Sequence, residues 1–176
     1  DRLRLVRSYN MNRFVIALAW ALHALPHPFG MSTIGATALY AGAYGNRATA
    51  WLIPLAPVAL ASMFLSPYPS IVMLCVLGGF ALATAIGRYT LGGRRSVPRF
   101  ALAITGGATT FFLVSNLGVW LAGYYPATPA GLLACYIAGL PFLGLSLLAD
   151  TVYTTLLFGL HALAGTGVRA SRVNVA

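Results

Sequence analysis

The residue with the strongest chemical character in this sequence is Asp150, an aspartate inside a long apolar stretch. A carboxylate near the centre of a membrane helix costs roughly 2.5 to 3.5 kcal/mol on insertion scales, so it is expected to face a bundle interior with a partner there, or to be protonated. Other polar side chains fall at a comparable depth, namely Ser115, Asn116, Thr151, Thr154 and Thr155. Two interpretations stay open. The polar residues could form a cluster that binds a ligand, or they could form a hydrogen-bonded clamp between the fifth and sixth membrane spans, which are expected near 98–122 and 142–164.

The three histidines are the other candidates for a site. His23 and His27 are four residues apart, the spacing of two metal ligands on one helix face, but Pro26 and Pro28 interrupt such a helix, so we predict no metal site. A histidine within a span can also ligate a haem or a chlorophyll-type pigment, for which His23 and His161 are the candidates. Lone intramembrane histidines more often bond a neighbouring helix, so no cofactor is required.

The sequence contains few residues that could take part in catalysis. The sequence contains no nucleophile with a base partner, no phosphate-binding loop and no paired carboxylates, because the only acidic residue besides Asp150 is Asp1. Cys75 and Cys135 each lie in an apolar segment without a second cysteine nearby, which excludes the usual zinc and redox spacings. We therefore expect a protein that is not an enzyme.

The distribution of charge determines the elements that position these residues. All eleven basic residues are arginine, and they form four clusters at residues 2–13, 47, 88–99 and 169–172. The arginine-free intervals between them contain 33, 40 and 69 residues, and the only acidic residue in any of them is Asp150. Because a bilayer core takes about 20 apolar residues per helix, each interval suits a helix that crosses and a second that returns. Proline-containing reversals without arginine lie at 26–30, 66–70 and 123–129.

The sequence therefore predicts an all-α, polytopic integral membrane protein with one membrane domain over residues 1–176. Its spans are expected near 12–26, 31–45, 48–66, 69–88, 98–122 and 142–164, with a short outer or re-entrant helix at 129–141, where prolines and glycines interrupt the apolar run. The first two spans are short, so we expect neighbouring helices to shelter them, the helices to be tilted or broken, or the local bilayer to thin around them. Arginine marks the cytoplasmic side, which places both termini there.

Composition agrees with this topology. The chain is 59% hydrophobic and 7% charged, with a mean hydropathy of +0.82. Its net charge of +9 marks loop orientation and contact with lipid headgroups, and we predict no nucleic-acid partner. Small residues recur four apart, which lets helices approach closely in lipid. These positions are Ala17 and Ala21, Ala38 and Gly42, Gly79, Ala83 and Gly87, Ala103 and Gly107, and Gly118 and Ala122.

Three stretches carry a resemblance to a known family. They are residues 11–17 leading to the break at 26–28, residues 41–47, and residues 138–142 running on to Asp150. On these stretches the chain resembles an uncharacterised family of bacterial membrane proteins that is itself similar to the substrate-binding S components of energy-coupling-factor transporters. The relatives carry an acidic residue in the third span, where this chain reads Ala-Ser-Met-Phe at 61–64.

The resemblance implies a six-helix bundle in the bacterial inner membrane that binds a small molecule from outside, beneath the loop after the first span. A separate coupling protein and two ATPases would then drive release. The pair Ala17 and Ala21 matches the motif by which the first helix of S components docks on the coupling protein.

Two functions follow as hypotheses. In the first, the protein is an S-component-like subunit that captures a small molecule for import, and its ligand-binding residues are Asn116, Trp120, Asp150 and Tyr153, with His27 and Phe29 in the gating loop. In the second, it is a non-catalytic accessory subunit packed against a photosynthetic or respiratory complex, in contact with pigments or lipids. A cavity lined by Asn116 and Asp150 favours the first function, and a sealed interior favours the second.

Overall fold

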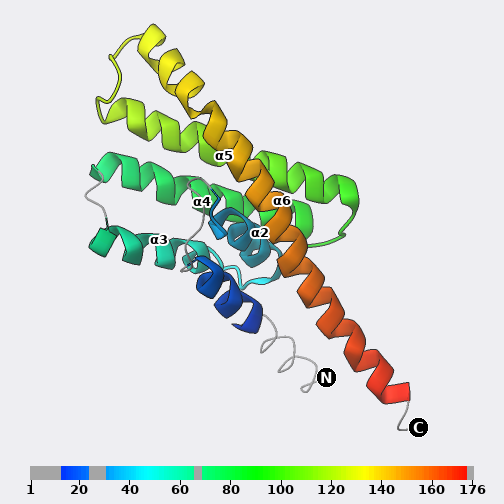
Figure 1. Ribbon diagram of the computed structural model, residues 1–176. Coiled ribbons are helices and arrows are strands. Elements are labelled where there is room, and N and C mark those ends of the chain that lie inside the picture. The colour runs from blue at the N-terminus through cyan, green and yellow to red at the C-terminus, as the bar shows by residue number, and fades with distance from the viewer. Residues whose placement is uncertain (1–12, 24–30, 66–68, 174–176) are drawn as a thin grey trace.

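The computed structural model describes residues 13–23, 31–65 and 69–173, leaving aside the side chains of 64, 65 and 164–173. Every element of regular structure in these ranges is a helix, which confirms the predicted all-α fold class (Figure 1). The helices are Arg13–His23, α2 (Ile34–Tyr44), α3 (Leu52–Leu65), α4 (Ser70–Leu91), α5 (Val97–Leu121) and α6 (Pro129–Val173).

Three of these helices are long and apolar enough to cross a bilayer. They are α4, α5 and the portion of α6 from Pro129 to Leu163. The helix Arg13–His23 and α3 are apolar but shorter. At 1.5 Å per residue, the 11 residues of α2 extend only about 17 Å, roughly half of a hydrocarbon core.

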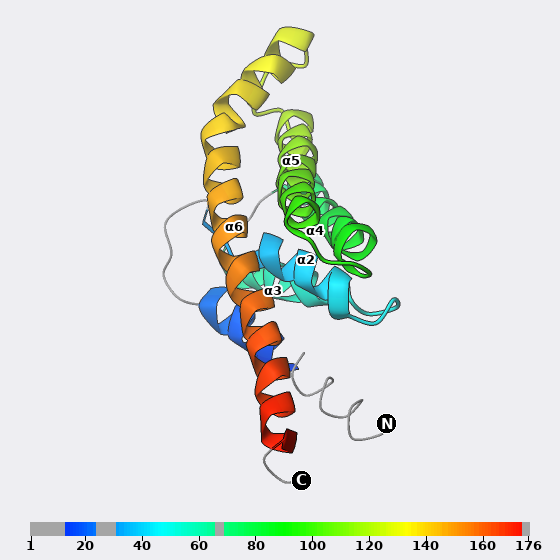
Figure 2. The same ribbon diagram turned by 90° about the vertical axis from the view of Figure 1, so that its right-hand side faces the viewer.

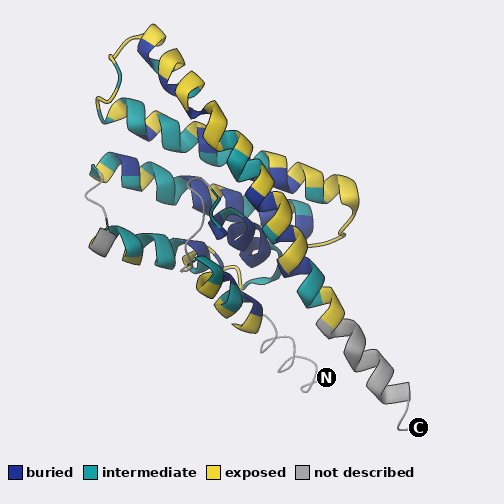
Figure 3. Cartoon of the chain, in the orientation of Figure 1, coloured by how far each residue is buried: buried dark blue, intermediate teal, exposed yellow. Residues whose placement is uncertain are grey.

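The short helix α2 is the buried centre of the molecule. It contacts α3, α4, α5 and α6, and Ile34 and residues 36–42 are buried (Figure 3). Neighbouring helices therefore shelter α2 on all sides. This agrees with the expectation that a span too short to cross the bilayer core is enclosed by other helices. The helix Arg13–His23 is fixed beside it, because the Thr33 hydroxyl donates to the Ala19 carbonyl at 3.1 Å and the Trp20 indole donates to the Ile53 carbonyl of α3 at 3.1 Å.

Small residues allow α2 to lie directly against α4. A Cβ added at Gly42 would meet the backbone of Thr84 and Arg88, and one added at Gly87 would meet the backbone of Leu39. The helices α4 and α5 approach in the same way, since a Cβ at Gly118 would overlap Cys75. The predicted use of these small-residue faces for internal packing is confirmed at these positions.

Helix α6 differs from its prediction. The sequence predicts a separate short helix at 129–141 followed by a span at 142–164, whereas α6 runs without a break from Pro129 to Val173. Pro141 lies inside it and removes one backbone hydrogen bond, which bends a helix but does not end it when apolar residues continue on both sides. Figure 2 shows the amino-terminal part of α6 leaning away from the line of the rest.

Two of the arginine clusters meet at one end of the bundle. The Arg88 guanidinium donates to the carbonyls of Gly45 and Asn46, both at 3.3 Å, and thereby joins the end of α4 to the loop after α2. The Arg95 guanidinium lies 4.0 Å from the centre of the Tyr44 ring. Because the Tyr44 ring stacks on His161 at 3.9 Å, the carboxyl-terminal half of α6 reaches this end as well (Figure 1).

Candidate ligand-binding cavity

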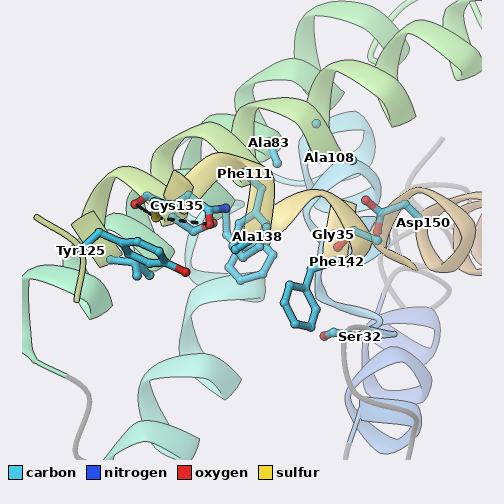
Figure 4. Close-up of a pocket in the computed structure, with 17 residues that line it drawn as sticks. Ser32, Gly35, Ala83, Ala108, Phe111, Tyr125, Cys135, Ala138, Phe142 and Asp150 are labelled. Atoms are coloured by element: carbon cyan, nitrogen blue, oxygen red, sulfur yellow. Dashed lines mark hydrogen bonds between the residues drawn. The ribbon is translucent and has the colours of Figure 1, made fainter. Parts of the chain in front are cut away.

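A cavity of about 470 Å³ lies among α2, α4, α5 and α6, within the usual range for small-molecule sites. Most of its wall is apolar. Its polar side chains are Ser32, Ser115, Asn116, Tyr125, Cys135, Ser146 and Asp150. Figure 4 shows Tyr125, in the loop between α5 and α6, at one end of the cavity and Asp150 at the other. The stretch of α6 from Cys135 to Asp150 rises roughly 22 Å, so the cavity is elongated.

The Asp150 carboxylate is held against the beginning of α2. The residue is 5% exposed, and its carboxylate accepts a hydrogen bond from the backbone N–H of Ala36. Gly35 makes this approach possible, because a Cβ there would overlap both carboxylate oxygens. The first N–H groups of a helix lack partners within the helix and carry partial positive charge, so a carboxylate is a favourable cap. The clamp that the sequence suggested between the fifth and sixth spans thus joins α6 to α2 instead.

Asn116 lies on the same wall, between α5 and α6. Its Nδ2 donates to the Phe112 carbonyl of its own helix at 2.8 Å. Its Oδ1 faces α6, since a Cβ added at Gly139 would lie 2.6 Å from this oxygen. The Cys135 thiol donates to the Asn116 backbone carbonyl at 3.4 Å, with Oδ1 at 3.9 Å. The absence of a side chain at Gly139 therefore lets α6 pack directly against the Asn116 side chain, which lines the cavity.

Aromatic rings form much of the remaining wall. Phe80 of α4 and Phe111 of α5 stack with centroids 4.3 Å apart and planes inclined by 24°. Phe142 of α6 completes this aromatic part of the lining (Figure 4). These rings offer flat apolar surfaces on which the body of a ligand can rest.

The structure brings together two of the predicted ligand-binding residues. Asn116 and Asp150 line the cavity, whereas Trp120 and Tyr153 do not. The Trp120 indole donates to the Pro126 carbonyl at 2.9 Å and so fixes the loop between α5 and α6. Tyr153 is half-buried and packs against the hydrophobic core. His27 and Phe29 lie outside the described residues.

Several lining residues were not predicted from the sequence. On α6 these are Cys135, Gly139, Phe142 and Ser146. Together with the predicted Asp150 they are spaced four, three, four and four residues apart, so all five lie on one face of a continuous helix. That spacing is visible in the sequence, but the expected break at Pro141 concealed it. Ser32 and Phe80 join the site only through tertiary packing, so no local pattern could have identified them.

The two described histidines make contacts between helices. His161 Nδ1 and the Tyr40 hydroxyl are 2.7 Å apart, and His23 Nδ1 and the Ser32 hydroxyl are 3.3 Å apart. Among the residues that the structure describes, no group of three or more His, Cys, Asp or Glu side chains is arranged to hold a metal ion. These contacts favour the helix-bonding interpretation of the histidines.

A second cavity of about 390 Å³ lies next to the first. It is lined by residues of the helix Arg13–His23, α2, α3 and α4, and His23 and Ser62 are among its polar groups. Ser32 and Phe80 line both cavities, so they form the partition between them.

Comparison with known proteins identifies one family. The model of a family of unknown function (DUF6580) matches residues 7–172, which is nearly the whole chain. No curated protein and no solved structure matches the sequence.

Proposed function

The chain belongs to the DUF6580 family, whose function is unknown, and we propose that it is a membrane-embedded binding subunit. In this proposal it captures a small molecule from outside the cell for import by a separate ATP-driven coupling module. The observation that carries the proposal is the cavity of about 470 Å³ with both Asn116 and Asp150 on its wall.

The proposal places the protein in the bacterial inner membrane with six spans. Large apolar side chains are exposed along each of the three long helices, as lipid contact requires; they include Leu74 and Leu82 of α4, Leu102 and Leu113 of α5, and Leu133, Ile137 and Leu148 of α6. The shorter helices complete the bundle around α2. The arginine-bearing loops after α2 and α4 share one end, which the distribution of charge assigns to the cytoplasm.

The direction of ligand entry follows from this topology. Tyr125 lines the cavity and belongs to the loop between α5 and α6, which contains no arginine and is assigned to the outside. The cavity then runs inward from this loop to Asp150. A mostly apolar cavity with a few polar groups is typical of a small-molecule site, and this favours capture over an accessory role with a sealed interior.

A docking face for the coupling protein is available on the helix Arg13–His23. Ala17 and Ala21 are exposed, whereas Ala38, Ala83 and Ala103 are buried between helices. Close packing in lipid uses small residues, so the exposed pair supports the proposed contact with a partner helix.

The proposal is tested by purification of the tagged protein from its native membrane in a mild detergent, followed by mass spectrometry of the proteins that accompany it. We expect a coupling protein and two ATPases with the wild type. The double variant Ala17→Leu, Ala21→Leu is expected to lose them, while Ala134→Leu, at an exposed alanine of α6, retains them. Stoichiometric reaction-centre or oxidoreductase subunits would instead establish the accessory role and contradict import.

A further inference from the structure

We propose that the ligand of this cavity is an amphipathic monocation, with an apolar body against the phenylalanines and an ammonium or protonated ring nitrogen at Asp150. This inference rests on the proposed function, because it assigns a chemical class to the captured molecule. It is drawn from the charges, hydrogen bonds and shape of the cavity.

The cavity and the loops carry charges of opposite sign, because Asp150 lines the cavity while Arg88 and Arg95 contact the loop end of α2. Among the described residues that line the cavity there is no arginine or histidine, although the chain carries eleven arginines and a net charge of +9. The carboxylate on this described wall belongs to Asp150, and the only other acidic residue in the sequence is Asp1. A ligand against the described lining therefore meets a negative group and no basic one, which favours cations and disfavours anions.

The carboxylate has acceptor capacity left for a ligand. In the described part of the chain, the backbone N–H of Ala36 is the hydrogen-bond donor that reaches it. An ionised carboxylate has about four acceptor positions on its two oxygens, so a single backbone donor leaves most of them open. Because burial of an unpaired carboxylate is costly, a cationic ligand would supply the countercharge that the lining does not.

The rest of the wall suits the apolar part of such a molecule. The rings of Phe111 and Phe142 lie between the Asp150 end and the Tyr125 end (Figure 4), and the Phe80 ring stacks on Phe111. Aromatic faces also attract cations, so the path to the carboxylate does not repel a positively charged head group. The elongated shape matches a molecule with its charge at one end.

The test compares three probes that share one ring system: 1-naphthylmethylamine, 1-naphthylmethanol and 1-naphthylacetate. Each is titrated at neutral pH into the full-length protein in phosphatidylcholine nanodiscs, and binding is followed by probe fluorescence. We expect the amine to bind at least about ten-fold more tightly than the alcohol, the difference that one charge-assisted hydrogen bond supplies. The acetate is expected to bind most weakly.

Three variants make the test specific. Asp150→Asn keeps an acceptor for Ala36 and is expected to reduce the preference for the amine over the alcohol to within about three-fold, because most of the charge-assisted contribution is lost. Ser146→Phe fills the cavity one helical turn from Asp150 and should abolish binding of the amine and alcohol. Ser62→Phe, which alters only the second cavity, should leave all three affinities unchanged.

The wild-type ranking of the probes decides the inference even if Asp150→Asn fails to fold. Equal binding of amine and alcohol, tighter binding of the acetate, or no binding of the amine would overturn it. The proposed function fails separately, if the purified protein brings no ATPases with it. Alcohol binding that Ser146→Phe abolishes would show an occupied cavity even where the preference for a cation is absent.

Discussion

Asp150 combines two roles that usually compete in a buried carboxylate. Its hydrogen bond from the Ala36 N–H caps the beginning of α2, and its side chain also lines the cavity. The cap explains how a carboxylate is accommodated in an apolar bundle without an arginine beside it, because aligned backbone dipoles at a helix start favour negative charge. In our proposal, a cationic ligand would occupy the acceptor positions that this hydrogen bond leaves open.

The capping role predicts a loss of stability when the carboxylate is removed. Asp150→Ala leaves the Ala36 N–H without its acceptor and is expected to lower the free energy of unfolding by about 1 to 3 kcal/mol. Asp150→Asn retains a carbonyl oxygen at this place and should cost less. Thermal unfolding followed by tryptophan fluorescence measures both. If the two variants unfold at the wild-type temperature, the capping role is wrong.

Gly139 has an equally specific role on the same face of α6. A Cβ at this position would lie 2.6 Å from Asn116 Oδ1 and 2.8 Å from the Phe112 ring. We therefore expect Gly139→Ala to displace the Asn116 side chain and to weaken binding of 1-naphthylmethanol by about ten-fold, as the loss of one hydrogen bond would. Gly144→Ala, also on α6 but with no atom within 4 Å of the added Cβ, is the matched control. Equal affinities of the two variants would contradict the placement of Asn116.

At the scale of elements, the close contact between α2 and α4 determines whether the site forms. Their glycines allow backbone to approach backbone, so that an 11-residue helix can be enclosed by longer ones. The carboxyl end of α2 is then held by Arg88 and Arg95, and its amino end by Asp150. A short helix of this kind depends on its neighbours more than on its own propensity to be helical.

A pair of glycine variants in α4 tests this contact. Gly87→Ala places a Cβ against the Leu39 backbone and is expected to destabilise the protein by more than about 1 kcal/mol, since backbone cannot move aside as a flexible side chain can. Gly78→Ala meets nothing within 4 Å and should be neutral or stabilising, because alanine is the better helix former. The comparison is made by thermal unfolding in the same detergent. A Gly87→Ala variant as stable as Gly78→Ala would show that α2 and α4 do not approach so closely.

The sequence predicts these elements better than it predicts their continuity. In the described part of the chain, the intervals between arginines and the proline-containing breaks place the first five helices within about four residues of their observed bounds, because long apolar runs between charges leave few alternatives. Because the prediction treats prolines as helix ends, it separates residues 129–141 from the last span. In the structure, α6 continues through Pro141. That error divides the face that carries Cys135, Gly139 and Asp150, and so most of the α6 wall is absent from the predicted site.

The residues of the cavity wall show a second limit of prediction from the sequence. Asn116 and Asp150 could be predicted because polar groups within apolar spans are costly and therefore rarely without a role. Trp120 and Tyr153 were included for their proximity in sequence, and one fixes a loop while the other packs into the core. Phe80 and Ser32 could not be predicted, since an aromatic or hydroxyl residue gains its place in the cavity only from packing between helices distant in sequence.

At the scale of the whole molecule, the proposed topology makes the cavity accessible from outside. Arginines gather at one end of the bundle, and the loop that contains Tyr125 leads into the cavity. In a variant with both native cysteines replaced by serine, single cysteines at Tyr124, Arg47 and Arg94 report the orientation. A membrane-impermeant maleimide added to intact inner-membrane spheroplasts is expected to label only position 124. Labelling at 47 or 94 would reverse the topology.

The proposed function requires a small molecule in the cavity among α2, α4, α5 and α6. Native mass spectrometry of the protein released from detergent micelles detects such a molecule, with Ser146→Phe as the blocked comparison. We expect a wild-type species that carries the added mass of one small molecule, and no such species for the variant. A wild type without added mass, or one that carries the same lipid adducts as Ser146→Phe, would show that the cavity binds no small molecule.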